Sequence, residues 1–327
     1  MIFGHQKIRQ ILQGQIKNDK LSHAYLFFGP EGIGKKGIAE EFGRALLCLN
    51  SRSGWFCSRC DSCYSIAVGA HPDFQFIGPE SEETEKFSRT KEIGISSIRK
   101  VIEWNRLKPV LGVRKVIIIN DAQWMSTETQ NAFLKSLEEP ADSTIFILVA
   151  PSVNDLLKTV VSRCRQIKFL PLSFADFSRA LEDFKIEPAR LSELYFIFSG
   201  RIGPAMSFAT TEGQKEFSRA RAELLGIFRM DLGARYRFSE KLTKNEKKLL
   251  ETINLWRILL RDLIFIKEGI TDVLINGTLE SVLIKEARSH KPDKLLRIFK
   301  LLGRLSFSLK ETNLNPRLGL DWVMTGL

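Results

Sequence analysis

A glycine-rich stretch near the N-terminus has the residue types and spacing of a phosphate-binding loop. Its glycines are Gly29, Gly32 and Gly34, and Lys35 follows them. In such loops the glycines let backbone N–H groups close on phosphate oxygens, and the lysine adds a positive charge. The next position normally holds a serine or threonine that binds Mg²⁺, but here it is Lys36. A cation cannot replace that oxygen, so we expect the loop to hold ATP or ADP without hydrolysis, or no nucleotide.

Four of the five cysteines lie close together in the sequence. They are Cys48, Cys57, Cys60 and Cys63, with the spacing C-x8-C-x2-C-x2-C. The overlapping C-x2-C pairs predict a tight turn that presents thiolates to one ion. Four thiolates with no open position are typical of a structural Zn²⁺ site. Zinc would hold in place a polar loop that buries little apolar surface of its own.

The same cysteines leave other chemistry open. An iron–sulfur cluster also binds four thiolates, although nothing else in the sequence indicates redox work. Two disulfides would suit an oxidising compartment, and thiols without a metal are a further alternative. We expect Zn²⁺ as the structural cofactor, and we expect the isolated Cys164 to bind no metal.

Short apolar runs alternate with helical patterns through the first 170 residues. An apolar run precedes the glycine loop and a helical pattern follows it, as a phosphate loop requires. The predicted strands are 24–28, 73–77, 115–119, 144–150 and 166–170. The predicted helices are 36–48, 95–106 and 127–137. Such alternation favours a parallel sheet covered on both faces.

The strand signals largely stop after Leu170. Ser173 is a candidate N-cap for a following helix, and the apolar spacing over 244–268 predicts a long amphipathic helix. The C-terminal helical block can pack against like blocks of other subunits as a collar, or bury its apolar face as a monomeric bundle. The predicted domains are 1–170, 171–212 and 213–327.

Composition narrows the class of protein. The 327 residues suit two or three domains, and the 44% apolar share is that of an ordinary globular protein. No apolar run predicts a membrane span or a secretory signal, so we expect a cytoplasmic protein without a membrane partner. The net charge of +11 favours a polyanionic partner, although the basic residues are spread along the chain and also suit a solvated surface.

Further motifs follow one another in a fixed order. They are Leu21–Phe27, His71–Asp73, Asn120–Ala122, Asn131–Pro140, Ser162–Cys164 and Asn313–Leu318. With the glycine loop and the cysteines, they resemble the delta-prime subunits of bacterial replicative clamp loaders, members of the AAA+ family. The resemblance implies an α/β fold: an AAA+ phosphate-loop domain with a parallel sheet and a zinc-binding insertion (48–63), then a small helical lid domain and a C-terminal all-α collar domain.

The resemblance implies that this chain lacks the family's ATP-hydrolysing residues. In active relatives the strand matching 115–119 is followed by Asp-Glu, which orient Mg²⁺ and activate water. Here these positions hold Asn120, which binds Mg²⁺ poorly, and Asp121, which is one methylene shorter than glutamate.

Two nucleotide-sensing positions also differ. At the first position, after the strand at 144–150, the polar residue is displaced, and Ser152 lies just beyond it. At the second position the family has an arginine, and this chain has Gly203, with Arg201 nearby. With Lys36, four elements depart from the active pattern. Because phosphoryl transfer depends on placed charge and metal, their joint loss predicts no catalytic residue acting on the chain's own nucleotide.

One catalytic element of the family is retained. Arg163 matches the arginine that AAA+ subunits insert into the ATP site of a neighbour. Such an arginine stabilises transition-state charge in trans and needs no nucleotide in its own subunit. The resemblance therefore implies that Arg163 enters the ATP site of an adjacent gamma or tau subunit and assists hydrolysis there. The alternative is a surface arginine at a helix end or a structural ion pair.

The resemblance also implies the partners. They are the gamma or tau and delta subunits of the DNA polymerase III clamp loader and, within that assembly, the sliding clamp and primed DNA. Ser97, Arg99 and Lys100 lie at the start of a predicted helix that faces DNA in the family, where they could hold a phosphate. A solvated helix face is the alternative.

Two other functions fit parts of the sequence. The first is an ATP-hydrolysing gamma- or tau-type subunit, against which Lys36 and Asn120 argue. The second is a zinc-containing nucleic-acid-binding protein with a relic phosphate-loop fold. Tight DNA binding by the isolated chain, with a steep salt dependence, would favour the second, because a loader subunit is expected to bind DNA weakly alone.

Overall fold

A computed structural model describes residues 4–51, 54–79, 92–140, 143–270, 274, 280–312 and 314–327 of the chain. The chain forms two compact units. One comprises Met1–Ala180 with Gly200–Gly203, and the other comprises Leu181–Ser199 with Pro204–Leu327. Asn313, the first residue of the last sequence motif, lies outside the described residues.

The first unit is built on a parallel sheet of five strands in the order β2-β3-β4-β1-β5. The strands are β1 (Ala24–Phe28), β2 (Phe74–Ile77), β3 (Lys115–Ile119), β4 (Thr144–Ala150) and β5 (Arg165–Lys168). Every residue of β3 and β4 is buried, as expected of central strands covered on both faces. The α/β sheet prediction is confirmed, with β5 ending two residues earlier than predicted.

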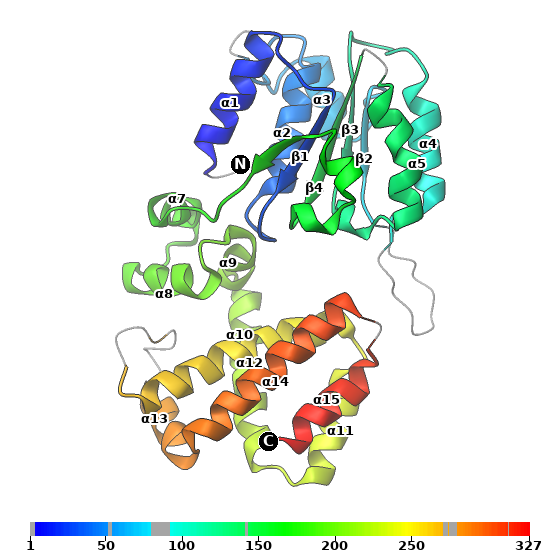
Figure 1. Ribbon diagram of the computed structural model, residues 1–327. Coiled ribbons are helices and arrows are strands. Elements are labelled where there is room, and N and C mark those ends of the chain that lie inside the picture. The colour runs from blue at the N-terminus through cyan, green and yellow to red at the C-terminus, as the bar shows by residue number, and fades with distance from the viewer. Residues whose placement is uncertain are drawn as a thin grey trace. The chain divides into compact units, whose positions relative to one another are not determined.

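Helices cover both faces of this sheet (Figure 1). On one side lie α1 (Gln6–Lys17), α2 (Lys35–Leu47) and α3 (Asp61–Ala67), and on the other α4 (Ile95–Asn105) and α5 (Thr127–Glu138). The short elements η1 (Ala122–Trp124), η2 (Val153–Asp155) and α6 (Lys158–Val161) join the later strands and helices, and α7 (Phe174–Ala180) follows β5. The predicted N-cap Ser173 accepts a hydrogen bond from the Asp176 N–H at 3.2 Å.

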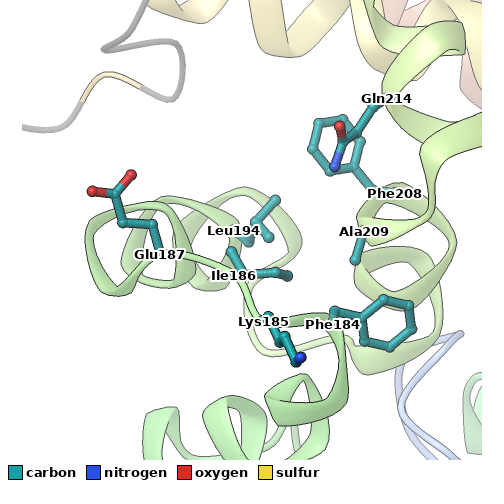
Figure 2. A pocket seen from close by; sticks show the side chains of 8 residues that line it. All are labelled: Phe184, Lys185, Ile186, Glu187, Leu194, Phe208, Ala209 and Gln214. Carbon is teal, nitrogen blue, oxygen red and sulfur yellow. The ribbon is translucent and has the colours of Figure 1, made fainter.

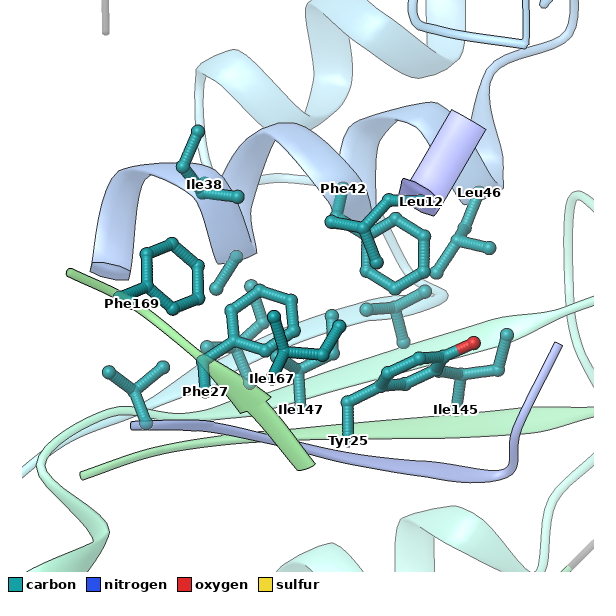
Figure 3. Close-up of a cluster of buried hydrophobic side chains, with 14 of the residues drawn as sticks. Leu12, Tyr25, Phe27, Ile38, Phe42, Leu46, Ile145, Ile147, Ile167 and Phe169 are labelled. Atoms are coloured by element: carbon teal, nitrogen blue, oxygen red, sulfur yellow. The ribbon is translucent and has the colours of Figure 1, made fainter. Parts of the chain in front are cut away.

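An aromatic cluster fixes α2 against the sheet (Figure 3). The Tyr25 and Phe42 rings meet edge to face at 5.1 Å between centroids, and Phe27 lies 5.2 Å from Phe169. The Tyr25 hydroxyl donates to Gln15 Oε1 at 2.7 Å, so this buried polar group is satisfied. Because α2 begins at the glycine loop, its packing also sets the position of that loop.

The second unit is helical. Its elements are η3 (Glu182–Phe184), α8 (Pro188–Phe198), α9 (Ile202–Ala209) from Pro204 onward, α10 (Thr211–Arg229), α11 (Leu232–Leu242), α12 (Glu246–Lys267), α13 (Glu280–Ser289), α14 (Pro292–Glu311) and α15 (Pro316–Thr325). The predicted long amphipathic helix is α12, which packs against α10, α13 and α14. Its Trp256 is 1% exposed and donates to the Ala220 carbonyl. Since α10 continues through residue 212, the three-domain division stays a prediction.

A hollow of about 260 Å³ lies near the end of α9 and the start of α10. Phe184, Ile186, Leu194 and Phe208 contribute apolar surface, while the Glu187 carboxylate points away from them (Figure 2). Lys185 and Gln214 add polar groups to the lining.

A buried charge network holds the segment between α4 and β3. The Asp73 carboxylate is fully buried and accepts hydrogen bonds from the N–H groups of Val110, Leu111 and Gly112 at 2.7, 2.7 and 3.2 Å. On the same segment, the buried Lys115 ammonium donates to the Leu107 carbonyl at 2.7 Å. The Asp73 carboxylate thus fixes the backbone of residues 110–112.

Replacing Asp73 by alanine should destabilise the first unit. Three N–H groups would lose their charged acceptor, which should lower the free energy of unfolding by roughly 2–3 kcal/mol. Asp73→Asn keeps one acceptor oxygen and should cost less. Urea unfolding of both variants measures the difference, and a cost below about 1 kcal/mol for Asp73→Ala would contradict the assigned role.

Candidate functional site

The glycine loop has the backbone form that its sequence predicts. It lies between the carboxyl end of β1 and the start of α2, and Gly29, Gly32 and Gly34 all have positive φ, at 148°, 75° and 98°. A Cβ atom on Gly29 would come 2.3 Å from the Phe169 carbonyl oxygen. A side chain is therefore excluded there both by backbone conformation and by the neighbouring strand end.

The lysine of the loop is turned onto the loop itself. Lys35 is 7% exposed, and its ammonium donates to the carbonyls of Gly29 and Pro30 at 2.5 and 2.8 Å. Burial lowers the pKa of Lys35, while the charges of Glu31 and Asp121 act in the opposite direction. The ammonium is thus held by backbone acceptors within the loop.

Lys36 points along the outside of α2. Its side chain is 56% exposed, with the ammonium 3.9 Å from Glu40 Oε1 and 4.7 Å from the centroid of the Phe76 ring. It supplies no oxygen for a metal at this position. Its charge is directed to the helix surface and not to the loop carbonyls that bind Lys35.

The residues after β3 bond to each other. Asn120 Nδ2 donates to Asp121 Oδ2 at 2.9 Å, and Asp121 has left-handed backbone conformation with φ 54°. Strands β1 and β3 are parallel, so these residues lie at the same sheet edge as the glycine loop. The structure therefore places the glycine loop and the Asn120-Asp121 pair at one edge of the sheet.

Two contacts from distant segments bind the loop carbonyls. The Gly203 N–H donates to the Gly32 carbonyl at 2.7 Å, and His5 Nε2 lies 2.6 Å from the Ile33 carbonyl oxygen. A Cβ on Gly203 would be 3.1 Å from the Gly32 oxygen, so the backbones meet closely where the family's arginine is expected. The role of His5 was missed in the sequence, because a lone histidine 28 residues from its partner gives no local signal.

Ser152, the displaced candidate sensor, is used locally. Its hydroxyl accepts from the Asn154 N–H at 3.2 Å, and its own N–H donates to the Asp155 carboxylate at 2.9 Å. This reciprocal pair caps η2.

The four predicted cysteine ligands converge. Cys48 directly follows α2, Cys60 directly precedes α3, and Cys63 lies within α3. With Cys57, their sulfur atoms all lie within 4.8 Å of one another, and the Cys48 and Cys60 sulfurs are 3.9 Å apart. Tetrahedral Zn–S bonds of about 2.3 Å require sulfur separations of about 3.8 Å. The four cysteines could therefore hold a metal ion.

The thiols have unequal proton affinities. Burial raises the pKa of Cys63, and its hydrogen bond with Cys60 adds to this, so the value reaches about 12. Burial also acts to raise the pKa of Cys60, but hydrogen bonds with the backbone of Cys63 and Leu49 outweigh it and lower the value to about 6. Four adjacent sulfurs cannot all carry negative charge without a cation among them, which suits a metal centre. Cys164 lies apart in the core, where burial raises its pKa to about 12.

Arg163 forms an ion pair at the opposite edge of the sheet. Its Nη2 atom lies 2.6 Å from Glu138 Oε1 at the end of α5, and its Nη1 donates to the Thr159 carbonyl at 2.9 Å. Arg165, two residues later, is in register with Tyr25 at the start of β1. The glycine loop begins four residues beyond that register, about 13 Å along the strand.

The three predicted DNA-contact residues lie on α4. Arg99 and Lys100 are exposed, and Ser97 is partly buried, with its N–H donating to the Gly94 carbonyl. Their contact with DNA stays a prediction. In the described part of the chain, no helix is both long and apolar enough to cross a bilayer.

Comparison with known proteins assigns the chain to a family. Residues 4–173, more than half of the chain, match the family described as "DNA polymerase III, delta subunit". The chain belongs to this family. A member from Pseudomonas aeruginosa, the DNA polymerase III subunit delta', is 37% identical over 184 residues, which are 55% of this chain and 53% of that protein. The delta' subunit of Bacillus subtilis is 28% identical over 68% of this chain and 63% of its own length. The resemblance to delta-prime subunits is thus confirmed.

Other relatives share the same region. The tau/gamma subunit of Haemophilus influenzae is 31% identical over 63% of this chain, but over only 29% of its own length. This chain spans about half the length of the first curated relative that it matches. A solved structure of a gamma-subunit-related protein from Thermotoga maritima is similar over 96% of this chain and 97% of its own, with a TM-score of 0.48 and 20% identity.

The His5 contact predicts that acid weakens the first unit. Burial lowers the pKa of His5 below 6.5 in the folded chain, although its bond with the Ile33 carbonyl partly opposes this. Below pH 6.5 the unfolded chain therefore binds the proton more readily, and stability falls as pH falls. His5→Asn should lose less stability than the native chain between pH 7.5 and 5.5 in urea unfolding. Equal losses would show that His5 contributes nothing to the pH dependence.

Proposed function

We propose that this chain is a delta-prime-type clamp-loader subunit that completes the ATP site of a neighbouring ATPase and hydrolyses no ATP itself. The observation that carries the proposal is the separation of Arg163 from the chain's own glycine loop. The two lie at opposite edges of a parallel sheet. An arginine at that edge is suited to a site on another subunit, as arginine fingers supplied in trans are.

The chain's own nucleotide site supports the second half of the proposal. Lys36 replaces the hydroxyl that binds Mg²⁺, and Asn120 replaces the carboxylate that orients it. Asp121 is bonded to Asn120, and Gly203 stands where a phosphate-sensing arginine is expected. ATP or ADP binding by Gly29–Lys35 is compatible with this proposal, because binding and hydrolysis depend on different groups.

The ion pair with Glu138 gives Arg163 a partner before assembly. The Arg163 side chain is 35% exposed, so its guanidinium stays accessible while paired. Insertion beside a γ-phosphate would exchange one carboxylate for a more highly charged acceptor, which a guanidinium can bind with two parallel hydrogen bonds. Glu138 therefore positions the arginine without competing strongly with the phosphate.

The remaining roles follow from the family. We infer that the gamma or tau and delta subunits are the partners, and that the assembly loads the sliding clamp onto primed DNA in the cytoplasm. Ser97, Arg99 and Lys100 are the residues of α4 that we propose to contact DNA. The helices of 213–327 would supply the collar, and those of 171–212 the lid.

We also propose that the cysteine cluster binds structural Zn²⁺. The four-thiol set leaves no position for a substrate, and Cys48 and Cys60 join the end of α2 to the start of α3. The metal would thereby fix the 48–63 insertion to the phosphate-loop domain.

Replacing Arg163 by alanine should reduce ATP hydrolysis by the assembled clamp loader. Hydrolysis at the ATP site that Arg163 enters should become about 10³-fold slower or more. The total ATPase rate should therefore lose the contribution of that one site. Arg165→Ala, which removes an exposed arginine two residues away, is the matched control and should leave the rate unchanged.

Two further measurements separate the parts of this proposal. Glu138→Gln removes the resting partner and should retain most of the activity. Unchanged hydrolysis by an assembly containing Arg163→Ala would refute the role in trans. Robust ATP hydrolysis by the purified chain alone would refute the claim that it is inactive.

Metal analysis tests the zinc site. We expect about one equivalent of Zn²⁺ in the purified chain, and its near-complete loss in Cys60→Ser. Cys164→Ser removes a buried thiol outside the cluster and should keep the metal. Affinity should fall as pH falls, because the thiols must lose their protons to bind. Iron in place of zinc, or full metal content in Cys60→Ser, would contradict the assignment.

A further inference from the structure

The second unit carries a basic groove between α14 and α15. Its volume is about 460 Å³. Three cations line it, Arg297, Lys300 and Arg304, together with the single acidic side chain of Asp293. Trp322 of α15 lines the same groove. The hollow of Figure 2, in contrast, is lined by one cation, Lys185, and by no tryptophan.

The cations form one exposed row on α14. Their spacing of three and four residues places Arg297, Lys300 and Arg304 on a common helix face, and all three are exposed. The opposite face of α14 is core, with Leu295 and Ile298 fully buried. Among the described residues, none of the three cations forms an ion pair. Like charges at this spacing repel one another, and a bound anion would relieve that repulsion.

The indole adds a second kind of contact. Trp322 is 56% exposed, whereas its neighbours Leu320, Val323 and Met324 are buried and supply the packing of α15. The packing of α15 therefore gives no reason for an indole at position 322. A flat aromatic face beside a row of cations is the arrangement with which proteins bind single strands, through base stacking and phosphate contacts.

We propose that this groove binds single-stranded nucleic acid, with phosphates against Arg297, Lys300 and Arg304 and a base stacked on Trp322. An acidic peptide would use the cations but not the indole, and an apolar protein helix would cover the indole but leave three cations unpaired. The site is distinct from the predicted α4 contacts. The groove does not include Arg163, so the proposal can be tested independently of the role of Arg163 in trans.

Fluorescence polarisation with a labelled dT12 oligonucleotide tests the cation row in the full chain. Three phosphate contacts should give weak binding with a slope of log K against log salt of about −2. The triple variant Arg297→Ala/Lys300→Ala/Arg304→Ala should bind at least about ten-fold more weakly and lose most of that slope. The control Lys215→Ala/Lys241→Ala/Lys244→Ala removes the same charge from exposed positions of the same unit and should change affinity by less than about two-fold.

Trp322 provides an independent measurement. Trp322→Ala should weaken dT12 binding by about five-fold or more, whereas Trp322→Phe keeps an aromatic face and should retain most of the affinity. The native chain should also show fluorescence quenching that is lost in Trp322→Phe, because Trp322 is the most exposed of the five tryptophans. Thermal melting confirms that each variant is folded. If the triple variant is unfolded, the single variant Lys300→Glu replaces it as the test of the cation row.

Several outcomes would overturn the proposal. Equal weakening by the groove and control triples would show diffuse charge attraction and no site. Loss of binding in Arg99→Ala/Lys100→Ala alone would place the contact on α4. Displacement of dT12 by decaglutamate, with no effect of Trp322→Ala, would assign the groove to an acidic protein partner. Self-association of the chain that is lost in Trp322→Ala would make the face a protein interface.

Discussion

The polarity of the parallel sheet is the constraint on which the rest of the structure depends. All strands run in one direction, so their carboxyl ends form one edge and their amino ends the other. Gly29 follows β1 and Asn120 follows β3, which places both at the carboxyl edge. Arg163 precedes β5 and therefore lies at the amino edge. The glycine loop and Arg163 of one chain thus lie at opposite edges of the sheet, and no local rearrangement of a loop would bring them together.

The glycine loop is retained as part of the packing of the first unit. Backbone and side-chain donors from Gly203, His5 and Lys35 reach its carbonyls, and the aromatic cluster under α2 fixes its outgoing helix. Of these donors only Lys35 is buried, and loss of its carbonyl partners would cost about 1–3 kcal/mol. These packing contacts would favour the same loop conformation whether or not the loop binds a nucleotide.

The sequence predicts those features that depend on local pattern. The strands of the sheet, the long helix α12 and the four converging cysteines follow from periodicity and spacing. It does not reveal the contact of His5 with Ile33 or the ion pair of Arg163 with Glu138, because the partners lie 28 and 25 residues apart and nothing near either one marks the other. The groove at Arg297 and Trp322 is hidden for the same reason: the net charge of +11 is spread along the chain, and only folding gathers part of it beside an indole.

The pairing of Arg163 with Glu138 also bears on the proposed action of this arginine in trans. A fully exposed guanidinium would sample many rotamers, and ordering it on insertion would cost conformational entropy. A fully buried ion pair would be ordered but expensive to break. Both partners here are partly exposed, at 35% and 49% of their side chains, so solvent screens the pair and keeps it weak. The Thr159 carbonyl holds the same guanidinium from a second side. The side chain is thereby ordered while its partner remains easy to exchange, a compromise that suits the arginine-finger role proposed for it.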